Sequence, residues 1–193
     1  MGSVWDLRAS LYDVCEASDY RRGSQKAALF REMRGRVLFA AVGTGVDIQH
    51  FPLGLSIAAI DISDKMLRKA EKRARRYRGH LELCLADAQS LKFPDASFDT
   101  VVTSCTMCSV PDPLRAFREF HRVLRPGAQL LMFEHVRSRN PILGLALDMM
   151  TLWTRWWGTE MNRDTLANAR AAGFQLTQIT GVYLDIILAV RAF

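Results

Sequence analysis

The sequence lacks any long run of apolar residues. No part of its 193 residues reaches the roughly 18 uninterrupted apolar residues that a membrane-spanning helix needs. The nearest stretch, 142–157, is interrupted by Asp148 and Arg155. The start of the chain is amphipathic and broken by charges, which predicts no signal peptide. We therefore expect a cytoplasmic protein whose contact with membranes, if it has any, is peripheral.

Cysteine and histidine are scarce, with four of each. The cysteines lie in apolar or helical contexts, which is typical of a reducing compartment and argues against a disulfide framework. Cys105 and Cys108 form a C-x-x-C pair, but no nearby His or Cys pair supplies the remaining ligands of a zinc site. We interpret them as core or pocket-lining thiols and expect no metal centre.

The remaining composition is that of an ordinary globular domain, with 49% apolar and 24% charged residues. A net charge of +6 favours anionic ligands or surfaces without specifying nucleic acid. Seven basic residues and one acid lie within 68–78. The solvated outer face of a helix is the preferred interpretation, and contact with anionic lipid is the second. Nucleic acid is disfavoured because no aromatic residues are interleaved for stacking.

Apolar runs alternate with helical patterns along the chain. Strands are predicted at 37–42, 57–60, 81–85, 98–104 and 129–135, with a closing antiparallel pair at 174–179 and 183–190. Two helices are expected within 4–33, and others after Gly45 and at 65–77, 113–124 and 163–172, with a sharp turn at 125–127. Because most of these strands are uninterruptedly apolar, the pattern indicates a parallel α/β sheet that is buried on both faces.

The most informative stretch is a strand that ends at Gly43-Thr44-Gly45, followed by a second strand that ends at Asp61. Glycines at such a turn let backbone N–H groups approach a ligand, and the later acid can accept both hydroxyls of a ribose. A dinucleotide fingerprint requires a further Gly or Ala where this chain has Ile48, so a nicotinamide or flavin site is disfavoured. The stretch therefore predicts a nucleotide-like ligand.

Polar residues also follow the other predicted strands. Asp87 follows the third strand, 104–108 the fourth, and Glu134 with His135 the fifth. Ligands of open parallel sheets bind beyond the carboxyl ends of the strands. Five strand ends that point to one crevice are a stronger signal than any one of these motifs.

Several motifs together resemble the class I S-adenosylmethionine-dependent methyltransferases, in the branch of quinone, phospholipid and thiol methyltransferases. They are VLFAAVGTG (37–45), IDISDKML (60–67), ADAQSLKFPDASFDTVV (86–102) and SVPDPLRAFREFHRVLRPGAQLLMFEHV (109–136), with the terminal strand pair. The resemblance implies a Rossmann-like seven-stranded, mostly parallel sheet with an antiparallel C-terminal pair and helices on both faces. It implies a single domain over 1–193, with a helical lid at 1–34, a cofactor-binding core at 36–136 and a substrate-covering insert at 140–160.

The same resemblance implies S-adenosylmethionine as the cofactor. The implied cofactor-binding residues are Ala41, Gly43, Gly45, Asp61, Ile62, Met66, Asp87, Ala88, Ser104 and Cys105. Gly43 and Gly45 would line the methionine part, Asp61 would bind the ribose, and Asp87 would contact the adenine. Tyr12 would close over the pocket as a lid.

Two positions depart from the family pattern. The family usually has an acid where Phe39 stands and a glycine where Ala41 stands. The missing carboxylate removes a partner of the cofactor's ammonium group, and we expect Asp47 to replace it in part. Ala41 is a mild change provided that its φ stays negative.

The acceptor side is less defined. His135 is a candidate general base because its pKa suits proton transfer near neutral pH, and the alternative is a structural histidine at a strand end. Within 141–157, a helical face of Leu, Met and Trp side chains predicts either an apolar substrate pocket or a helix that closes the core. Trp153 and Trp157 are the candidate substrate contacts, and an inward Asp148 would attract an amine.

We therefore expect methyl transfer to a small, apolar or lipid-linked amine or thiol. One alternative is a quinone or phenol C- or O-methyltransferase, for which a base at His135 would matter. Another is a cofactor-binding scaffold that has lost catalysis, which the changes at Phe39 and Ala41 favour. The expected partners are a small-molecule or lipid acceptor and, peripherally, a membrane; nothing in the sequence predicts an oligomeric state.

Overall fold

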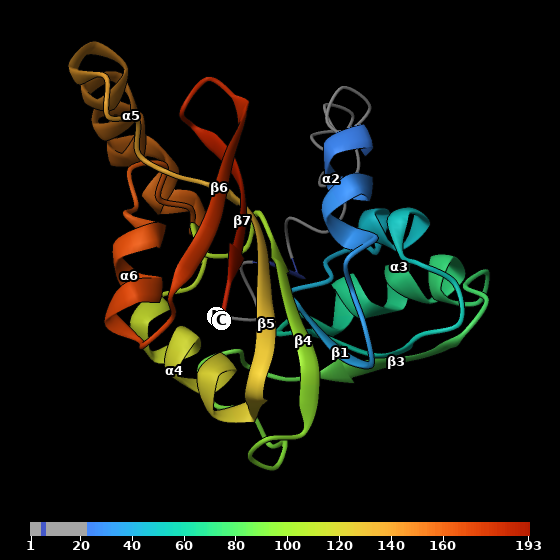
Figure 1. Ribbon diagram of the computed structural model, residues 1–193. Coiled ribbons are helices and arrows are strands. Elements are labelled where there is room, and N and C mark those ends of the chain that lie inside the picture. The colour runs from blue at the N-terminus through green and yellow to red at the C-terminus, as the bar shows by residue number, and fades with distance from the viewer. Residues whose placement is uncertain (1–4, 7–22) are drawn as a thin grey trace.

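The computed structural model describes residues 5–6 and 23–193, and its centre is a seven-stranded sheet. The strand order is β3-β2-β1-β4-β5-β7-β6 (Figure 1). The strands are β1 (Arg36–Ala40), β2 (Ser56–Asp61), β3 (His80–Leu85), β4 (Phe98–Ser104), β5 (Leu124–His135), β6 (Leu176–Tyr183) and β7 (Ile187–Ala192). Strands β1 to β5 pair in parallel, and β7 lies antiparallel between β5 and β6. The predicted sheet, with its antiparallel C-terminal pair, is confirmed.

Helices cover both faces of the sheet, as expected (Figure 1). On one face, α2 (Gly23–Phe30) and α3 (Asp64–Ala74) cover a core that includes Phe39 and Phe133. On the other, α4 (Pro113–Val123) and α6 (Thr165–Ala171) cover a core that includes Phe117. The alternation of side chains along each buried strand supplies both cores, which explains why these strands are apolar at successive positions.

Polar caps set where the helices begin. Ser63 accepts a hydrogen bond from the backbone N–H of Met66 at the start of α3, and Asp112 does the same for Arg115 in α4. Each cap satisfies an N–H group that has no partner within its helix. These caps place the first turns of both helices beside the carboxyl ends of the strands.

The structure corrects three details. The helix expected after Gly45 is only a short 3-10 helix, η2 (Val46–His50), because Pro52 disfavours a helical Phe51. The sharp turn expected at 125–127 is an irregularity within β5, where Gly127 takes a φ of 74°. The closing strands, β6 and β7, each begin and end later than predicted. Of the two helices expected in 4–33, α2 is present, and the greater part of that range lies outside the described residues.

The predicted insert at 140–160 contains α5 (Pro141–Thr154) and the short 3-10 helix η3 (Arg155–Trp157). Asn140 caps α5, accepting hydrogen bonds from the N–H groups of Ile142 and Leu143. The helix stands beyond the end of the sheet (Figure 1). Within the described residues, no helix is long and apolar enough to cross a membrane.

Candidate functional site

A cavity that is open to solvent lies at the carboxyl ends of β1, β2, β3 and β4. Open parallel sheets bind their ligands at this edge. Nine of the ten residues implied as cofactor-binding line it, and they are Ala41, Gly43, Asp61, Ile62, Met66, Asp87, Ala88, Ser104 and Cys105. Four of the five strand ends expected to converge therefore meet at this cavity, whereas Glu134 and His135, at the end of β5, do not line it.

Asp61 is a buried carboxylate at the end of β2. Its two oxygens accept hydrogen bonds from the backbone N–H groups of Gly43, at 2.8 Å, and Ser63, at 2.9 Å. Burial raises the pKa of Asp61, and these N–H donors oppose that rise. Each oxygen has a further lone pair, so the group can accept hydrogen bonds from a diol.

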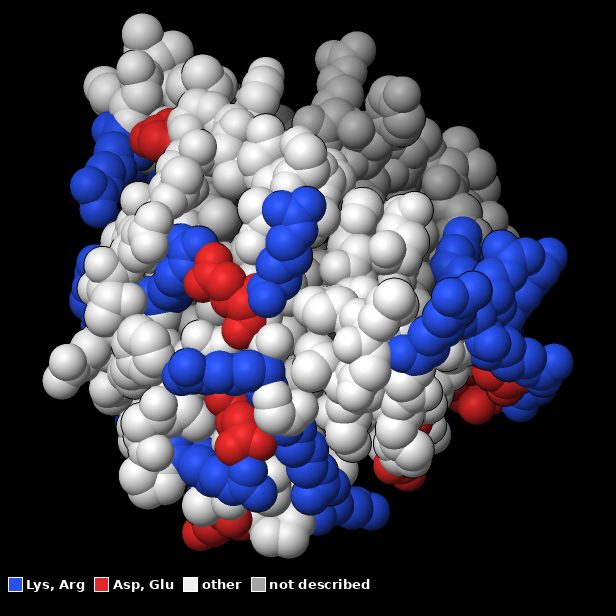
Figure 2. Space-filling model, turned by 45° about the vertical axis from the view of Figure 1, so that its right-hand side comes forward, with Lys and Arg blue, Asp and Glu red and all other residues white. Residues whose placement is uncertain are grey.

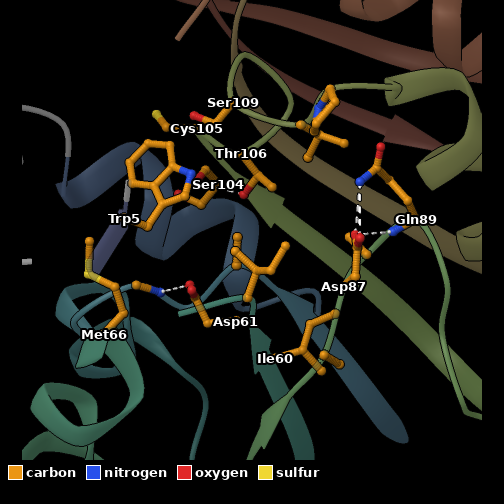
Figure 3. A pocket seen from close by; sticks show the side chains of 17 residues that line it. Trp5, Ile60, Asp61, Met66, Asp87, Gln89, Ser104, Cys105, Thr106 and Ser109 are labelled. Atoms are coloured by element: carbon orange, nitrogen blue, oxygen red, sulfur yellow. Dashed lines mark hydrogen bonds between the residues drawn. The ribbon is translucent and has the colours of Figure 1, made fainter. Parts of the chain in front are cut away.

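Asp87, just after β3, also lines the cavity and is held by Gln89 (Figure 3). It accepts hydrogen bonds from the backbone N–H of Gln89 at 2.8 Å and from the Gln89 amide nitrogen at 3.0 Å. The Gln89 amide oxygen in turn accepts from the backbone N–H of Asp112, at 3.0 Å. The sequence indicated no role for Gln89, although it lies within a quoted motif. It ties the end of β3 to the start of α4.

The turn after β1 has a left-handed backbone at three positions. The φ angles are 54° at Ala41, 57° at Gly43 and 81° at Gly45. The negative φ that would make Ala41 a mild change is therefore absent, and the residue is strained there. Gly45 lies outside the cavity lining; a Cβ there would come within 2.8 Å of Ile48 and 3.0 Å of Ala70. Its small size thus serves the packing of α3 against the turn.

Asp47, which we expected to replace in part the acid missing at Phe39, forms an ion pair away from the cavity. Asp47 accepts a hydrogen bond from Lys26 Nζ at 2.8 Å in a buried ion pair that links α2 to η2, and it does not line the cavity. Phe39 points into the core beneath α2, where its ring lies 5.7 Å from Phe30 and 4.8 Å from Phe51. The expectation that Asp47 contacts a cofactor ammonium group is wrong for this arrangement.

Among the described residues, the aromatic side chain that covers the cavity is that of Trp5 (Figure 3). The neighbouring Asp6 accepts a hydrogen bond from Ser63 Oγ at 2.5 Å, which fastens this segment to the start of α3. That hydrogen bond lowers the pKa of Asp6. Tyr12, the expected lid residue, lies outside the described residues. In the sequence, the amphipathic pattern at the start of the chain was the only sign that Trp5 packs against the rest of the protein.

A buried glutamate holds the loop that follows β4. Glu134 accepts hydrogen bonds from the backbone N–H groups of Thr106 and Met107, all at 3.1 Å. Burial raises the pKa of Glu134 to about 7. The loop it holds begins at Cys105, which has a φ of 50°, and Cys105 and Thr106 line the cavity. Glu134 therefore sets the shape of the cavity wall without lining it.

The C-x-x-C pair shows no sign of a reactive thiol at Cys108. Its Sγ donates a hydrogen bond to the carbonyl of Cys105 at 3.5 Å, and burial raises the pKa of the Cys108 thiol to about 11. Over the described parts of the chain, no group of three or more His, Cys, Asp or Glu side chains is arranged to hold a metal ion. Cys105 is the member of the pair that lines the cavity.

The acceptor-side candidates do not line this cavity. His135 is half-buried at the end of β5, beside β7, and alternation along the strand turns it to the same face as Phe133. Asp148 accepts hydrogen bonds from Arg137 Nε at 3.0 Å, Arg137 Nη2 at 2.7 Å and Asn162 at 3.0 Å. These hydrogen bonds lower the pKa of Asp148 to about 2, so its charge is already matched. Trp153 and Trp157 are exposed.

Comparison with known proteins identifies the family of the central part of the chain. Residues 38–132 match the family described as "methyltransferase domain". These residues form a methyltransferase domain. S-adenosylmethionine is the cofactor of this family, and the seven-stranded sheet is the fold of its class I members. A solved S-adenosylmethionine-dependent methyltransferase from Thermotoga maritima has the same fold, with a TM-score of 0.75 at 19% identity over 100% of this chain and 99% of that one.

Relatives of the methyltransferase domain differ in the acceptors that their names state. The chain is 35% identical over 111 residues to a phosphatidylethanolamine N-methyltransferase of Cereibacter sphaeroides (56% of this chain, 55% of that protein). It is 38% identical over 120 residues to the ubiquinone/menaquinone biosynthesis C-methyltransferase UbiE of Hahella chejuensis (58% and 48%). It is 33% identical over 132 residues to human thiol S-methyltransferase TMT1B (62% and 53%). The chain spans about half the length of these curated relatives.

The cavity of the methyltransferase domain fits the family's cofactor. Asp61 offers free lone pairs where a ribose diol would bind, and the glycine turn brings the backbone close to the same space. Ser104 Oγ is buried in the wall and has no hydrogen-bond partner within residues 5–6 and 23–193. A bound ligand can supply that partner. The polar groups that the cofactor requires are thus present on the adenosine side. On the side of the cavity implied for methionine, Ser104 Oγ is a polar group without a hydrogen-bond partner among the described residues.

Proposed function

We propose that the protein binds S-adenosylmethionine in this cavity and transfers its methyl group to a small, apolar or lipid-linked acceptor that carries an amine or a thiol. The observation that carries the proposal is the meeting of nine implied cofactor residues from separate strand ends in one cavity. When bound, the cofactor would supply an electrophilic methyl group on a positively charged sulfur. The remaining requirement is to position a nucleophile in line with the breaking bond.

The cavity walls support an acceptor whose nucleophile needs little help in losing a proton. Of the described residues that line it, none is a histidine, lysine or arginine, and its two carboxylates, Asp61 and Asp87, already accept backbone hydrogen bonds. Ser104, Cys105 and Thr106 offer only weak acids and bases on the other side. A thiolate or an amine suits such a wall better than a carbon or phenol acceptor, which requires a positioned base.

The quinone or phenol alternative depends on His135 reaching the acceptor. Its place beside β7, outside the cavity lining, weighs against that alternative. The left-handed backbone of Ala41 favours the alternative of a scaffold that has lost catalysis. If this strained turn relaxed to another conformation, the affinity of the cavity for the cofactor would fall.

Two measurements test the proposal. Calorimetric titration with S-adenosylmethionine should give saturable heat, and no heat at millimolar cofactor would refute the proposed enzyme. A screen with methyl-labelled cofactor against amine, thiol, phenol and phospholipid acceptors should then show label transfer to an amine or a thiol. Transfer confined to a phenol or quinone would identify the alternative, and cofactor binding without transfer to any class would favour the scaffold.

A further inference from the structure

Helix α5 has two apolar faces, and only one of them is covered. Gly144, Leu147 and Thr151 are buried against the rest of the protein. On the other face, large apolar side chains recur at alternating intervals of three and four residues into η3, and they are from 54% to 87% exposed. They are Ile142, Leu145, Met149, Leu152 and Trp156. Single exposed apolar residues are normal, but a continuous stripe marks an interaction surface.

A second segment extends this surface. Tyr183 and Leu184, in the turn between β6 and β7, are 57% and 60% exposed. The adjacent Asp185 accepts hydrogen bonds from Ser138 Oγ and from the backbone N–H of Arg139, both at 2.6 Å. The turn is thereby tied to the segment that leads into α5, and both stand at the same end of the molecule (Figure 1).

The charges around this apolar surface leave a small basic excess. Residues 137–157 contain three arginines and one acid, Asp148, whose carboxylate is bound by Arg137, and the β6–β7 turn adds one further acid, Asp185. Arg139 and Arg155 are exposed, and Glu160 approaches Arg155 only to 4.0 Å while it pairs with Arg163 at 2.9 Å. A two-fold contact with a second copy would bring these arginines together, whereas an anionic surface would complement them.

The strongest basic cluster of the protein is not part of this surface. Arg68, Lys69, Lys72 and Arg73 lie on α3, and Arg76 follows just after it. Figure 1 shows α3 at the right of the sheet and α5 at its upper left, and Figure 2 shows one group of basic side chains at the right of its view. The α3 cluster therefore does not contribute to the charge beside α5, where Arg139 and Arg155 are exposed.

The α5 surface is connected to the rim of the cavity. The backbone N–H of Glu160, just after η3, donates a hydrogen bond to the carbonyl of Cys108 at 2.8 Å. Arg163 donates to the carbonyl of Pro111 at 3.5 Å, and Pro111 lines the cavity. The loop that forms one wall of the cavity is thus held by the segment that carries the exposed tryptophans.

We propose that α5, η3 and the β6–β7 turn dock on an anionic lipid bilayer and hold the mouth of the cavity close to the membrane surface. Tryptophan, leucine and methionine side chains would enter the interfacial region, and Arg139 and Arg155 would meet anionic headgroups. This inference rests on the proposed apolar acceptor for its purpose, since such an acceptor resides in the membrane. The docking itself requires no methyl transfer.

Vesicle co-sedimentation of matched leucine variants tests the docking. The double variant L145Q/L152Q removes apolar side chains that are 61% and 54% exposed, and the control L53Q removes one that is 69% exposed in the turn before β2, at the other end of the sheet. We expect the wild type and L53Q to bind phosphatidylcholine vesicles that contain phosphatidylglycerol, more weakly without it or at high salt. The double variant should bind about tenfold less or weaker still.

Each other outcome overturns the docking. Binding by the double variant equal to that of the wild type would do so, as would failure of the wild type to bind anionic vesicles. A wild-type dimer in sedimentation velocity that L145Q/L152Q dissociates, without vesicle binding, would assign the surface to a second copy. Equal thermal unfolding of the variants shows that the fold is kept, and W153Q/W156Q provides an independent second variant. Titration with S-adenosylmethionine in the absence of lipid reports the proposed function separately.

Discussion

The two sides of the cavity are built differently. At the ends of β2 and β3, which we assign to adenosine, Asp61 and Asp87 each accept hydrogen bonds from nearby N–H groups. At the ends of β1 and β4, which we assign to methionine, Ala41 and Cys105 have left-handed backbones, with φ angles of 54° and 50°. The carboxylates of the first side accept hydrogen bonds from backbone N–H groups around them, while on the second side the loop after β4 is held by Glu134, a residue outside the cavity lining.

This difference shows where the site tolerates change. A locally bonded carboxylate depends on few other residues, so its loss should affect ligand binding more than folding. The strained loop after β4 depends on Glu134, which is buried and outside the cavity lining. Changes on the methionine side should therefore appear first in stability and its pH dependence.

Substitution of Asp61 should have the largest effect on ligand binding. Asp61→Ala removes the acceptor for two ribose hydroxyls, and hydrogen bonds to charged groups are strong, so we expect cofactor affinity to fall about 100-fold in calorimetry. Asp64→Ala, an exposed acid paired with Arg68, is the control and should leave affinity unchanged. Equal affinity of Asp61→Ala and wild type would contradict the assignment. Because burial raises the pKa of Asp61, affinity should also fall on acidification before an exposed aspartate would titrate.

Because of Glu134, the protein should lose stability as the pH rises to neutrality, which is the opposite of the usual behaviour of a carboxyl group. Burial raises its pKa from 4.5 to about 7, so the folded state favours the protonated form. Its contribution to the free energy of unfolding is present below pH 4.5 and is lost as the pH rises through about 7. The loss should amount to about 3 kcal/mol. Urea unfolding of wild type and Glu134→Gln across this range measures it.

The control for Glu134 has the opposite sign. A hydrogen bond from Arg122 lowers the pKa of Glu119, so its contribution is present at neutral pH and is lost on acidification. Glu119→Gln should therefore differ from wild type most at neutral pH and least in acid. If Glu134→Gln follows the wild-type profile between pH 4.5 and 7, the carboxyl of Glu134 does not titrate there and the loop is held in another way.

A smaller effect is expected where the strain can be relieved directly. Ala41→Gly removes the clash of Cβ in the left-handed region, and we expect thermal unfolding to show a gain of about 0.5 to 1 kcal/mol after the entropic cost of glycine. Ala40→Gly, one residue earlier in ordinary strand conformation, should lose about 1 kcal/mol. Equal destabilisation by both would mean that Ala41 is not strained. Tighter cofactor binding by Ala41→Gly would show that the methionine side limits affinity.

Much of the fold was predictable because its signals are local. The apolar runs, the glycine turn and the cap at Ser63 each act over a few residues, and β4 was predicted with the bounds that the structure has. Features that depend on tertiary contacts were not predictable. An alanine gives no sign of a positive φ, and neither Glu134 nor Gln89 shows in the sequence which distant N–H group it will meet.

The acceptor side was the least predictable for a related reason. Because α5 is apolar nearly all around, its pattern does not define which face is buried. The helical face of Leu, Met and Trp side chains predicted within 141–157 is split in the structure, where Leu147 is buried and Met150 is 47% exposed. The resemblance implied Tyr12 as the lid, which lies outside the described residues, and among the described residues Trp5 is the aromatic residue that lines the cavity.

Substitution of His135 should have the smallest effect on turnover. It is also the sharpest test of whether methyl transfer depends on the residues of the cavity wall or on a base at the end of β5. A positioned general base is worth about 100-fold or more in rate. Because His135 lies outside the cavity lining beside β7, we expect His135→Ala to change turnover of the acceptor found by screening less than tenfold, with cofactor affinity unaltered. Ser104→Ala, at the cavity wall, is the matched comparison and should have the larger effect on turnover. A loss of about 100-fold in His135→Ala, with a pH–rate profile that loses a group titrating near neutrality, would place the base at β5 and restore the quinone or phenol alternative.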